Sequence, residues 1–250
     1  MKLHILGSSS AGNCYVFDNG KEALVIECGV AFKEVKKAVS FDISRIVGVL
    51  ISHEHKDHAA YVEDFLKMRI NCYSSEGTIR KLIERNNTND SNKKQFKLIN
   101  EYKKIGNFRI KSFKVVHNAE EPIGFLIYHK EMGTVLFATD CNSIDFKFKN
   151  LNNILIECNH SIRIITSNLK KGLITEAESV RILRNHMSIE TCMQTLKEND
   201  LRNVNNIVLI HLSEKNSNAK EFQKEVQIAT CKNVLIAEKN MTIELNKMPF

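Results

Sequence analysis

A cluster of metal-ligand residues directly after an apolar segment restricts the possible folds of this chain more than any other feature. Residues 46–51 read IVGVLI and are followed, after one serine, by His-Glu-His-Lys-Asp-His. The apolar run predicts a buried strand, so the polar residues begin the loop that leaves the sheet. His53 and His55 alternate on one side of an extended chain and can bind one ion. Asp57 and His58 lie past the turn and can reach a second ion, so the segment predicts a metal site.

The composition is that of an ordinary globular protein. The chain has 250 residues, and 43% of them are hydrophobic. No apolar run is long enough for a membrane span, and the N-terminus does not resemble a secretory signal. The seven cysteines are scattered without a C-x-x-C pair, which indicates free thiols in a reducing compartment. We therefore expect one domain over residues 1–250, without an inserted extra domain, in the cytoplasm and without a membrane partner.

The charge of the chain favours a polyanionic partner. The formal net charge is +7 and the pI is near 9.0. A basic surface of this kind is typical of proteins that bind nucleic acid. The chain is rich in Lys and Asn, and a general compositional bias of the source proteome remains the alternative. Nothing in the sequence identifies a protein partner.

Three further polar residues stand where apolar runs end. His117, Asp140 and His211 each follow such a run. Ligands from several strand ends converge at one edge of a sheet, which is how α/β proteins build many of their sites. Strands followed by helices recur in the two halves of the chain, an order that suits two packed sheets with helices outside.

At these residues the chain resembles the metallo-β-lactamase fold superfamily. The match consists of H-x-H-x-D-H at 53–58, then His117, Asp140 and His211. The resemblance implies an α/β fold, a four-layer αββα sandwich, with two divalent metal ions at one sheet edge. It assigns one ion to His53, His55 and His117, the other to Asp57, His58 and His211, and a bridging position to Asp140. Zinc suits these ligands best, and manganese and iron are also compatible.

Within the superfamily the chain looks most like the YycJ/WalJ-like group. The resemblance rests on GSSSAGN at 7–13, ECNH at 157–160, NHMS at 185–188 and HLSEKN at 211–216. Two motifs depart from the group, whose usual Asp-Ala-Gly is Glu27-Cys28-Gly29 here and whose Gly-His-Leu-Ser is NHMS. Neither departure changes a proposed ligand. The group is associated with exonuclease action on DNA.

The same resemblance suggests catalytic roles. Two divalent ions a few Å apart can generate hydroxide at neutral pH and stabilise both the attacking and the leaving oxygen. Asp57 would orient or deprotonate the water. His186 matches a histidine that is catalytic, and binds no metal, in the related RNase Z branch, so it would assist the leaving oxygen. The alternative for His186 is an ordinary residue near a helix N-terminus.

Further residues of these motifs are candidates for substrate binding. The serine-rich segment near the N-terminus can offer hydroxyl and backbone N–H groups to a phosphate, although a polar hairpin loop has the same composition. His160 would either line the substrate groove or support the site from behind. The predicted substrate-binding residues are Ser8, Ser10, Asn13, His160, Ser213 and Asn216.

These features predict a metal-dependent phosphodiesterase, an exonuclease acting on DNA. Asp140 and His186 are 46 positions apart, and His117 and Asp140 are 23 apart, which leaves no room for the inserted domain or the tRNA-gripping arm of some RNA-processing relatives. A small-molecule phosphodiesterase, a thioester hydrolase and an RNA-processing nuclease of the same fold remain alternatives. A non-enzymatic DNA-binding protein is disfavoured because every expected ligand is present.

Overall fold

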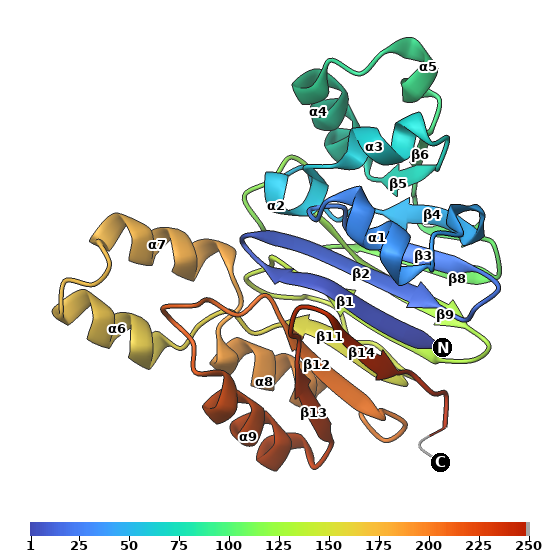
Figure 1. Cartoon of the computed structure of the whole chain (residues 1–250). Coiled ribbons are helices and arrows are strands. Elements are labelled where there is room, and N and C mark those ends of the chain that lie inside the picture. The colour runs from blue at the N-terminus through green and yellow to red at the C-terminus, as the bar shows by residue number, and fades with distance from the viewer. Residues whose placement is uncertain (249–250) are drawn as a thin grey trace.

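Two seven-stranded mixed sheets form the centre of the protein. The computed structural model describes residues 1–248 (Figure 1). The first sheet runs in the order β14 (Met241–Glu244), β1 (Lys2–Ser9), β2 (Gly12–Asp18), β3 (Ala23–Ile26), β4 (Ile46–Leu50), β5 (Cys72–Ser74) and β6 (Phe96–Leu98). The second runs in the order β13 (Asn233–Ile236), β12 (Asn206–Ile210), β11 (Asn153–Glu157), β10 (Gly133–Ala138), β9 (Ile123–His129), β8 (Phe108–Lys114) and β7 (Tyr102–Ile105).

The facing sides of the two sheets form the central core. Alternate residues of each strand point inward, because side chains of a strand alternate between its two faces. Tyr15 and Phe17 of β2 meet Phe125 of β9 and Phe137 of β10 in one buried cluster, and the Tyr15 and Phe137 rings are 5.3 Å apart. These large inward side chains hold the sheets face to face.

Helices pack on the outer side of each sheet, which gives the four layers of an αββα sandwich and confirms the predicted fold class. Their bounds are α1 (Phe32–Ala38), α2 (Lys56–Ala59), α3 (Val62–Lys67), α4 (Glu76–Asn86), α5 (Asp90–Lys93), α6 (Ile162–Lys170), α7 (Glu176–Asn185), α8 (Ile189–Glu198) and α9 (Ala219–Thr230), with a short 3₁₀ helix at Ile43–Arg45. Phe65 of α3 packs on the first sheet, and Phe222 of α9 packs on the second.

One edge of the sandwich collects the carboxyl ends of the strands that lead into the site. β3 and β4 are parallel, β10, β11 and β12 are parallel, and β8 has the same direction as β10 because both are antiparallel to β9. The chain leaves three of these strands through residues with positive φ, namely Glu27 (62°), Asp140 (44°) and His211 (55°). Non-glycine residues rarely adopt this left-handed conformation, and such residues concentrate at functional sites.

The connection from β11 to β12 contains α6, which pairs with α7. Ile165, Ile174 and Ile182 form a small apolar cluster of their own, and Figure 1 shows the α6–α7 pair projecting to one side of the sheets. The β-branched residues of α6 have low helix propensity, so the helix depends on this pairing.

Two smaller features depend on polar contacts. The polar segment at residues 86–94 contains α5, with the Asn89 side chain accepting a hydrogen bond from the Asn92 backbone N–H. His129 is 1% exposed, and its Nε2 lies 3.3 Å from Oε1 of Glu22. Among residues 1–248, no helix is long and apolar enough to cross a bilayer.

Candidate metal centre

Three imidazole rings converge at the strand edge. His53 and His55 follow β4, and His117 follows β8. His53 Nε2 lies 3.1 Å from His55 Nδ1, which in turn lies 3.2 Å from His117 Nε2. The outer nitrogens hold the rings in place, since His53 Nδ1 lies 2.9 Å from Ser52 Oγ and His117 Nδ1 donates to the Asn185 carbonyl at 2.9 Å. The three free nitrogens therefore point at one position.

A second group lies beside the first. Asp57 and His58 belong to α2, Asp140 follows β10 and His211 follows β12, and their ligand atoms all lie within 4.8 Å of one another. His58 Nε2 is 3.3 Å from Asp57 Oδ2 and 3.3 Å from Asp140 Oδ1. The other oxygen of Asp140, Oδ2, is 3.8 Å from His117 Nε2. Asp140 thus presents one oxygen to each group.

The buried charges shift the pKa values of these groups in opposite directions. Burial lowers the pKa of His53 well below its usual value. Burial also acts to lower the pKa of His58, but the Asp140 and Asp57 carboxylates outweigh it, so the pKa is raised well above its usual value. Against the same effect of burial, Asp140, Asp57 and Glu157 raise the pKa of His211 to about 10. The neighbouring carboxylates therefore raise the affinity of His58 and His211 for a proton.

Glu157 at the end of β11 connects four parts of the site. The side chain is fully buried, and Oε2 accepts hydrogen bonds from the backbone N–H groups of Cys141 (2.8 Å) and Met187 (3.1 Å). Oε1 lies 2.7 Å from His186 Nδ1 and 3.0 Å from His211 Nδ1. Burial of Glu157 acts to raise its pKa, but the neighbouring His186 and His211 lower it. The carboxylate positions both rings and the backbone next to Asp140.

Glu27 and Asn13 support the second group from the first sheet. Glu27 is fully buried, accepts a hydrogen bond from the Ser52 backbone N–H at 3.2 Å, and lies 3.6 Å from His58 Nδ1. Asn13 Nδ2 is 3.1 Å from His58 Nε2. Neither Glu27 nor Glu157 was predicted from the sequence to belong to the site. Each follows an apolar strand in the same way as Asp140, and that signal could have found both.

Gly29 allows the two loops of the first sheet to approach closely. A Cβ atom at this position would lie 1.7 Å from the carbonyl oxygen of Asp57. The Gly29 backbone N–H donates to the Asn13 carbonyl at 3.0 Å, and the Cys28 N–H donates to the His58 carbonyl at 2.7 Å. Because no other residue fits this gap, Gly29 determines how Asp57 and His58 sit.

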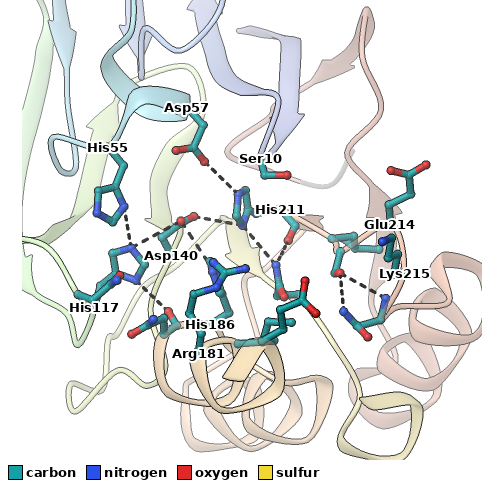
Figure 2. A pocket seen from close by; sticks show the side chains of 18 of the residues that line it. Ser10, His55, Asp57, His117, Asp140, Arg181, His186, His211, Glu214 and Lys215 are labelled. Atoms are coloured by element: carbon teal, nitrogen blue, oxygen red, sulfur yellow. Dashed lines mark hydrogen bonds and ion pairs between the residues drawn. The ribbon is translucent and has the colours of Figure 1, made fainter. Parts of the chain in front are cut away.

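The two groups form the floor of an open cavity of about 390 Å³. Figure 2 shows His55, His117, Asp140 and His211 turned toward one another, with His186 beside them. One wall comes from α7, and another comes from residues 212–216 after β12. The volume lies in the range of about 300–1,000 Å³ that is usual for ligand sites. His186 and Asp57 both line this cavity.

The predicted substrate-binding residues occupy different positions. Ser10, Ser213 and Asn216 line the cavity. Ser8 lies behind it, where its Oγ accepts hydrogen bonds from Tyr15 Oη at 2.8 Å and from the His211 backbone N–H at 3.0 Å. The other two residues, Asn13 and His160, do not line the cavity either.

Asn13, His160 and Asn216 are all buried, and of these only Asn216 lines the cavity. Asn13 is 0% exposed, and His160 is 1% exposed with its Nδ1 unpaired. Burial lowers the pKa of His160 to about 4. A substrate in the cavity would therefore meet neither Asn13 nor His160 without a rearrangement.

The donor set fits divalent metal ions. Imidazole nitrogens cannot all satisfy one another at 3.1 and 3.2 Å, because each neutral ring has only one N–H group. Tetrahedral ligands about 2.0–2.1 Å from a zinc ion are about 3.3 Å apart, close to the spacing seen here. His211 Nε2 is also buried without a hydrogen-bond partner among the described residues. Buried polar atoms rarely remain unpaired unless something binds them.

A family comparison agrees with this geometry. Residues 24–212 match the beta-lactamase superfamily domain. The chain belongs to the beta-lactamase superfamily. The match covers β3 through the residue after His211 and so contains both ligand groups. Membership of this superfamily, together with the His/Asp cluster, makes the chain a metal-dependent hydrolase that uses divalent ions.

Individual members of the superfamily extend the similarity over most of the chain. The exodeoxyribonuclease WalJ of Streptococcus pneumoniae is 28% identical over 237 residues, which cover 88% of this chain and 84% of that protein. The exodeoxyribonuclease YycJ of Bacillus anthracis is 25% identical over 236 residues, with 90% and 87% covered. The metallo-beta-lactamase fold protein YhfI of Bacillus subtilis has a TM-score of 0.72 at 19% identity and covers 97% of this chain and 99% of that one.

Proposed function

We propose that the chain is an exonuclease that hydrolyses phosphodiester bonds of DNA at a centre of two divalent metal ions. The observation that carries the proposal is the orientation of Asp140, whose Oδ1 faces His58 and whose Oδ2 faces His117. A carboxylate with one oxygen toward each ligand group suits two neighbouring ions better than one. The names of the two similar exodeoxyribonucleases support DNA as the substrate.

Two sets of side chains would hold the ions. His53, His55 and His117 would hold the first ion, Asp57, His58 and His211 would hold the second, and Asp140 could contribute to both. When bound, such a pair of ions lowers the pKa of water and offsets negative charge on a phosphate. Zinc is the ion that this donor set suits best, with manganese and iron as alternatives.

Asp57 is suited to handle the proton of the attacking water. Its carboxylate lies on the cavity side of the second group, and its side chain is 22% exposed, against 3% for Asp140. Burial acts to raise the pKa of Asp57, but His211 and His58 lower it far below its usual value. An ionised carboxylate at this position accepts a hydrogen bond from water and orients it toward the substrate.

His186 is suited to donate a proton to the leaving oxygen. Its Nδ1 donates to Glu157 at 2.7 Å, which leaves Nε2 as the nitrogen available to a ligand in the cavity. Burial acts to lower the pKa of His186, but the Glu157 and Asp140 carboxylates raise it above its usual value. A protonated imidazole beside the substrate is a general acid, and Glu157 is the positioning residue that holds its ring.

Arg181 and Lys215 are suited to hold the phosphates that flank the reacting bond. Both are exposed and line the cavity, Arg181 from α7 and Lys215 from the loop after β12. Figure 2 places Arg181 beside His186 and Lys215 on the side of the cavity next to Glu214. An Arg guanidinium can bind a phosphate through two parallel hydrogen bonds. Arg181 and Lys215 are the two Lys or Arg side chains of the cavity lining, and Glu178 and Glu214 on the same rim offset part of their charge.

A nuclease assay tests this function directly. Single-stranded and double-stranded DNA and RNA, each labelled at one end, are incubated with the protein and Zn²⁺, Mn²⁺ or Fe²⁺, beside a His55→Ala control. We expect mononucleotides to be released from DNA by the unaltered protein, and none by the variant. Release from RNA alone, or hydrolysis of a small phosphodiester without cleavage of DNA, would overturn the assignment of DNA.

A further inference from the structure

The outward side of strands β7, β8 and β9 is an exposed surface that combines cations with aromatic rings. We define this basic sheet face by its residues, which are Tyr102 and Lys104 of β7, Arg109 and Lys111 of β8, and Tyr128 of β9. Tyr102 is 70% exposed, and the three cations are exposed as well. The catalytic site described above uses none of these side chains.

Strand register places all five side chains on the same side. Tyr102 pairs with Lys111, Lys104 pairs with Arg109, and Arg109 pairs with Tyr128. Directly paired residues point to the same face of a sheet. The alternate residues of β8, Phe108 and Ile110, point into the central core, so the five side chains face outward.

The charge of this face is not neutralised locally. The outward positions of the three strands, all within the described residues, carry three cations and no carboxylate. The Arg109 guanidinium lies 5.7 Å from the centre of the Tyr128 ring, and the Lys111 ammonium lies 5.2 Å from that of Tyr102. Cation–π contacts of this kind orient a cation without removing its charge. The face therefore offers positive charge and flat rings together.

Strand β8 leads from the basic sheet face to the metal centre. This strand carries Arg109 and Lys111 and continues to His117, six residues beyond Lys111. An extended chain of six residues spans about 20 Å. The next outward residue of β8, Phe113, is buried (7% exposed), and its ring lies 6.0 Å from that of Phe146. Phe146 (45% exposed) and Val116 (52% exposed) are the exposed apolar side chains between the basic sheet face and His117.

We propose that the basic sheet face binds the unpaired strand of a DNA whose end is held at the metal centre. This inference rests on the proposed exonuclease function. Proteins bind single strands through cations that follow the backbone and aromatic rings on which bases stack. Only unpaired bases can stack on an exposed tyrosine such as Tyr102, so the rings favour a single strand over a duplex. The simpler explanation for the lysines is protection of the edge strand β7 against pairing with other chains.

Substrate length separates these explanations. A dinucleotide held at the metal centre cannot reach Lys111, whereas a 15-mer can. The test variant combines Lys104→Ala, Arg109→Ala and Lys111→Ala, and the matched control combines Lys33→Ala, Lys36→Ala and Lys67→Ala on the outer side of the first sheet. Both sets remove three cations, and Lys36 also has a cation–π contact, with Phe32 at 5.7 Å.

The measurements are KM and kcat for both substrates and the salt dependence of 15-mer binding. Three lost phosphate contacts reduce the slope of log K against log salt by about 2 for a single strand. We expect the test variant to show this reduction and a KM for the 15-mer raised about tenfold or more. Its kcat and its cleavage of the dinucleotide should not change, and the control should behave like the unaltered protein.

Tyr102 variants examine stacking separately from charge. We expect Tyr102→Ala to weaken 15-mer binding by about fivefold or more, the lower bound for loss of one stacked base. Tyr102→Trp, which keeps an aromatic ring, should bind the 15-mer as tightly as the unaltered protein. Melting temperatures of all variants establish that they are folded.

If the test and control variants behave alike while DNA is still cleaved, the basic sheet face does not bind DNA, and the proposed exonuclease function is unaffected. If the unaltered protein cleaves no DNA, the proposed function fails and this inference fails with it.

Discussion

The substitution Glu157→Gln tests how the buried carboxylate organises the site. Glu157 accepts hydrogen bonds from two backbone N–H groups and lies within 3.0 Å of Nδ1 of both His186 and His211. A glutamine of the same shape keeps one acceptor oxygen, but its amide nitrogen would face two N–H donors. The variant therefore changes the hydrogen bonds of this side chain and leaves the side-chain volume nearly unchanged.

The expected magnitude follows from these contacts. Each hydrogen bond to a charged group contributes about 1.5–3 kcal/mol, and a buried amide costs less desolvation than a carboxylate. With two bonds lost, we expect the free energy of unfolding to fall by about 2–4 kcal/mol, which is roughly 4–16 °C in Tm for a chain of this size. Loss of a partner behind a metal ligand typically costs about 10–100-fold in metal affinity or activity.

The assay combines thermal unfolding with metal competition against a chromophoric chelator. The control is Glu190→Gln on α8, where the carboxylate is exposed and accepts only a 3.4 Å hydrogen bond from Ser161 Oγ. We expect that variant to stay within about 0.5 kcal/mol of the unaltered protein. If Glu157→Gln also kept its Tm and bound metal within twofold of the unaltered protein, the role assigned to Glu157 would be wrong.

Three further predictions concern protonation, backbone packing and substrate binding. Because the pKa of His211 is raised to about 10, the chelator-treated protein holds a proton there at pH 7. Metal uptake should release that proton, and metal affinity should fall as pH falls; calorimetry in buffers of different ionisation enthalpy measures both, and uptake without proton release would contradict it. Gly29→Ala must displace the Asp57 carbonyl, since its Cβ would lie 1.7 Å away. A displacement of about 1 Å costs up to about 100-fold in rate, so an unchanged kcat would refute the close approach. Arg181→Ala should raise KM for DNA about tenfold, whereas Arg184→Ala, exposed on the same helix but outside the cavity lining, should not; equal KM values for the two would remove Arg181 from the site.

The sequence predicted the fold and the meeting of the ligands because both depend on simple patterns. Apolar runs of strand length that end in His or Asp place those side chains at one sheet edge, and the chain does bring His117, Asp140 and His211 together there. The beta-lactamase superfamily match confirms the family suggested by H-x-H-x-D-H and these residues. Periodicity and strand-end position can be recognised from residues that are neighbours in the sequence, so these predictions do not require knowledge of tertiary contacts.

Features that depend on tertiary contacts could not be predicted from the sequence in the same way. α6 has a β-branched sequence and forms because Ile165 packs with Ile174 and Ile182. The burial of His129 against Glu22 depends on residues that are 107 positions apart. Glu157 stands at a strand end like Asp140. Its role as a positioning residue follows from its four contacts, and the sequence alone does not predict those contacts.

The most direct test of the account is a single titration of chelator-treated protein with Zn²⁺ or Mn²⁺, in which bound metal and hydrolysis of end-labelled DNA are measured at each step. The account predicts that two ions bind per chain and that hydrolysis rises only as the second ion binds. Full hydrolysis with one ion bound, or none with two ions bound, would contradict it.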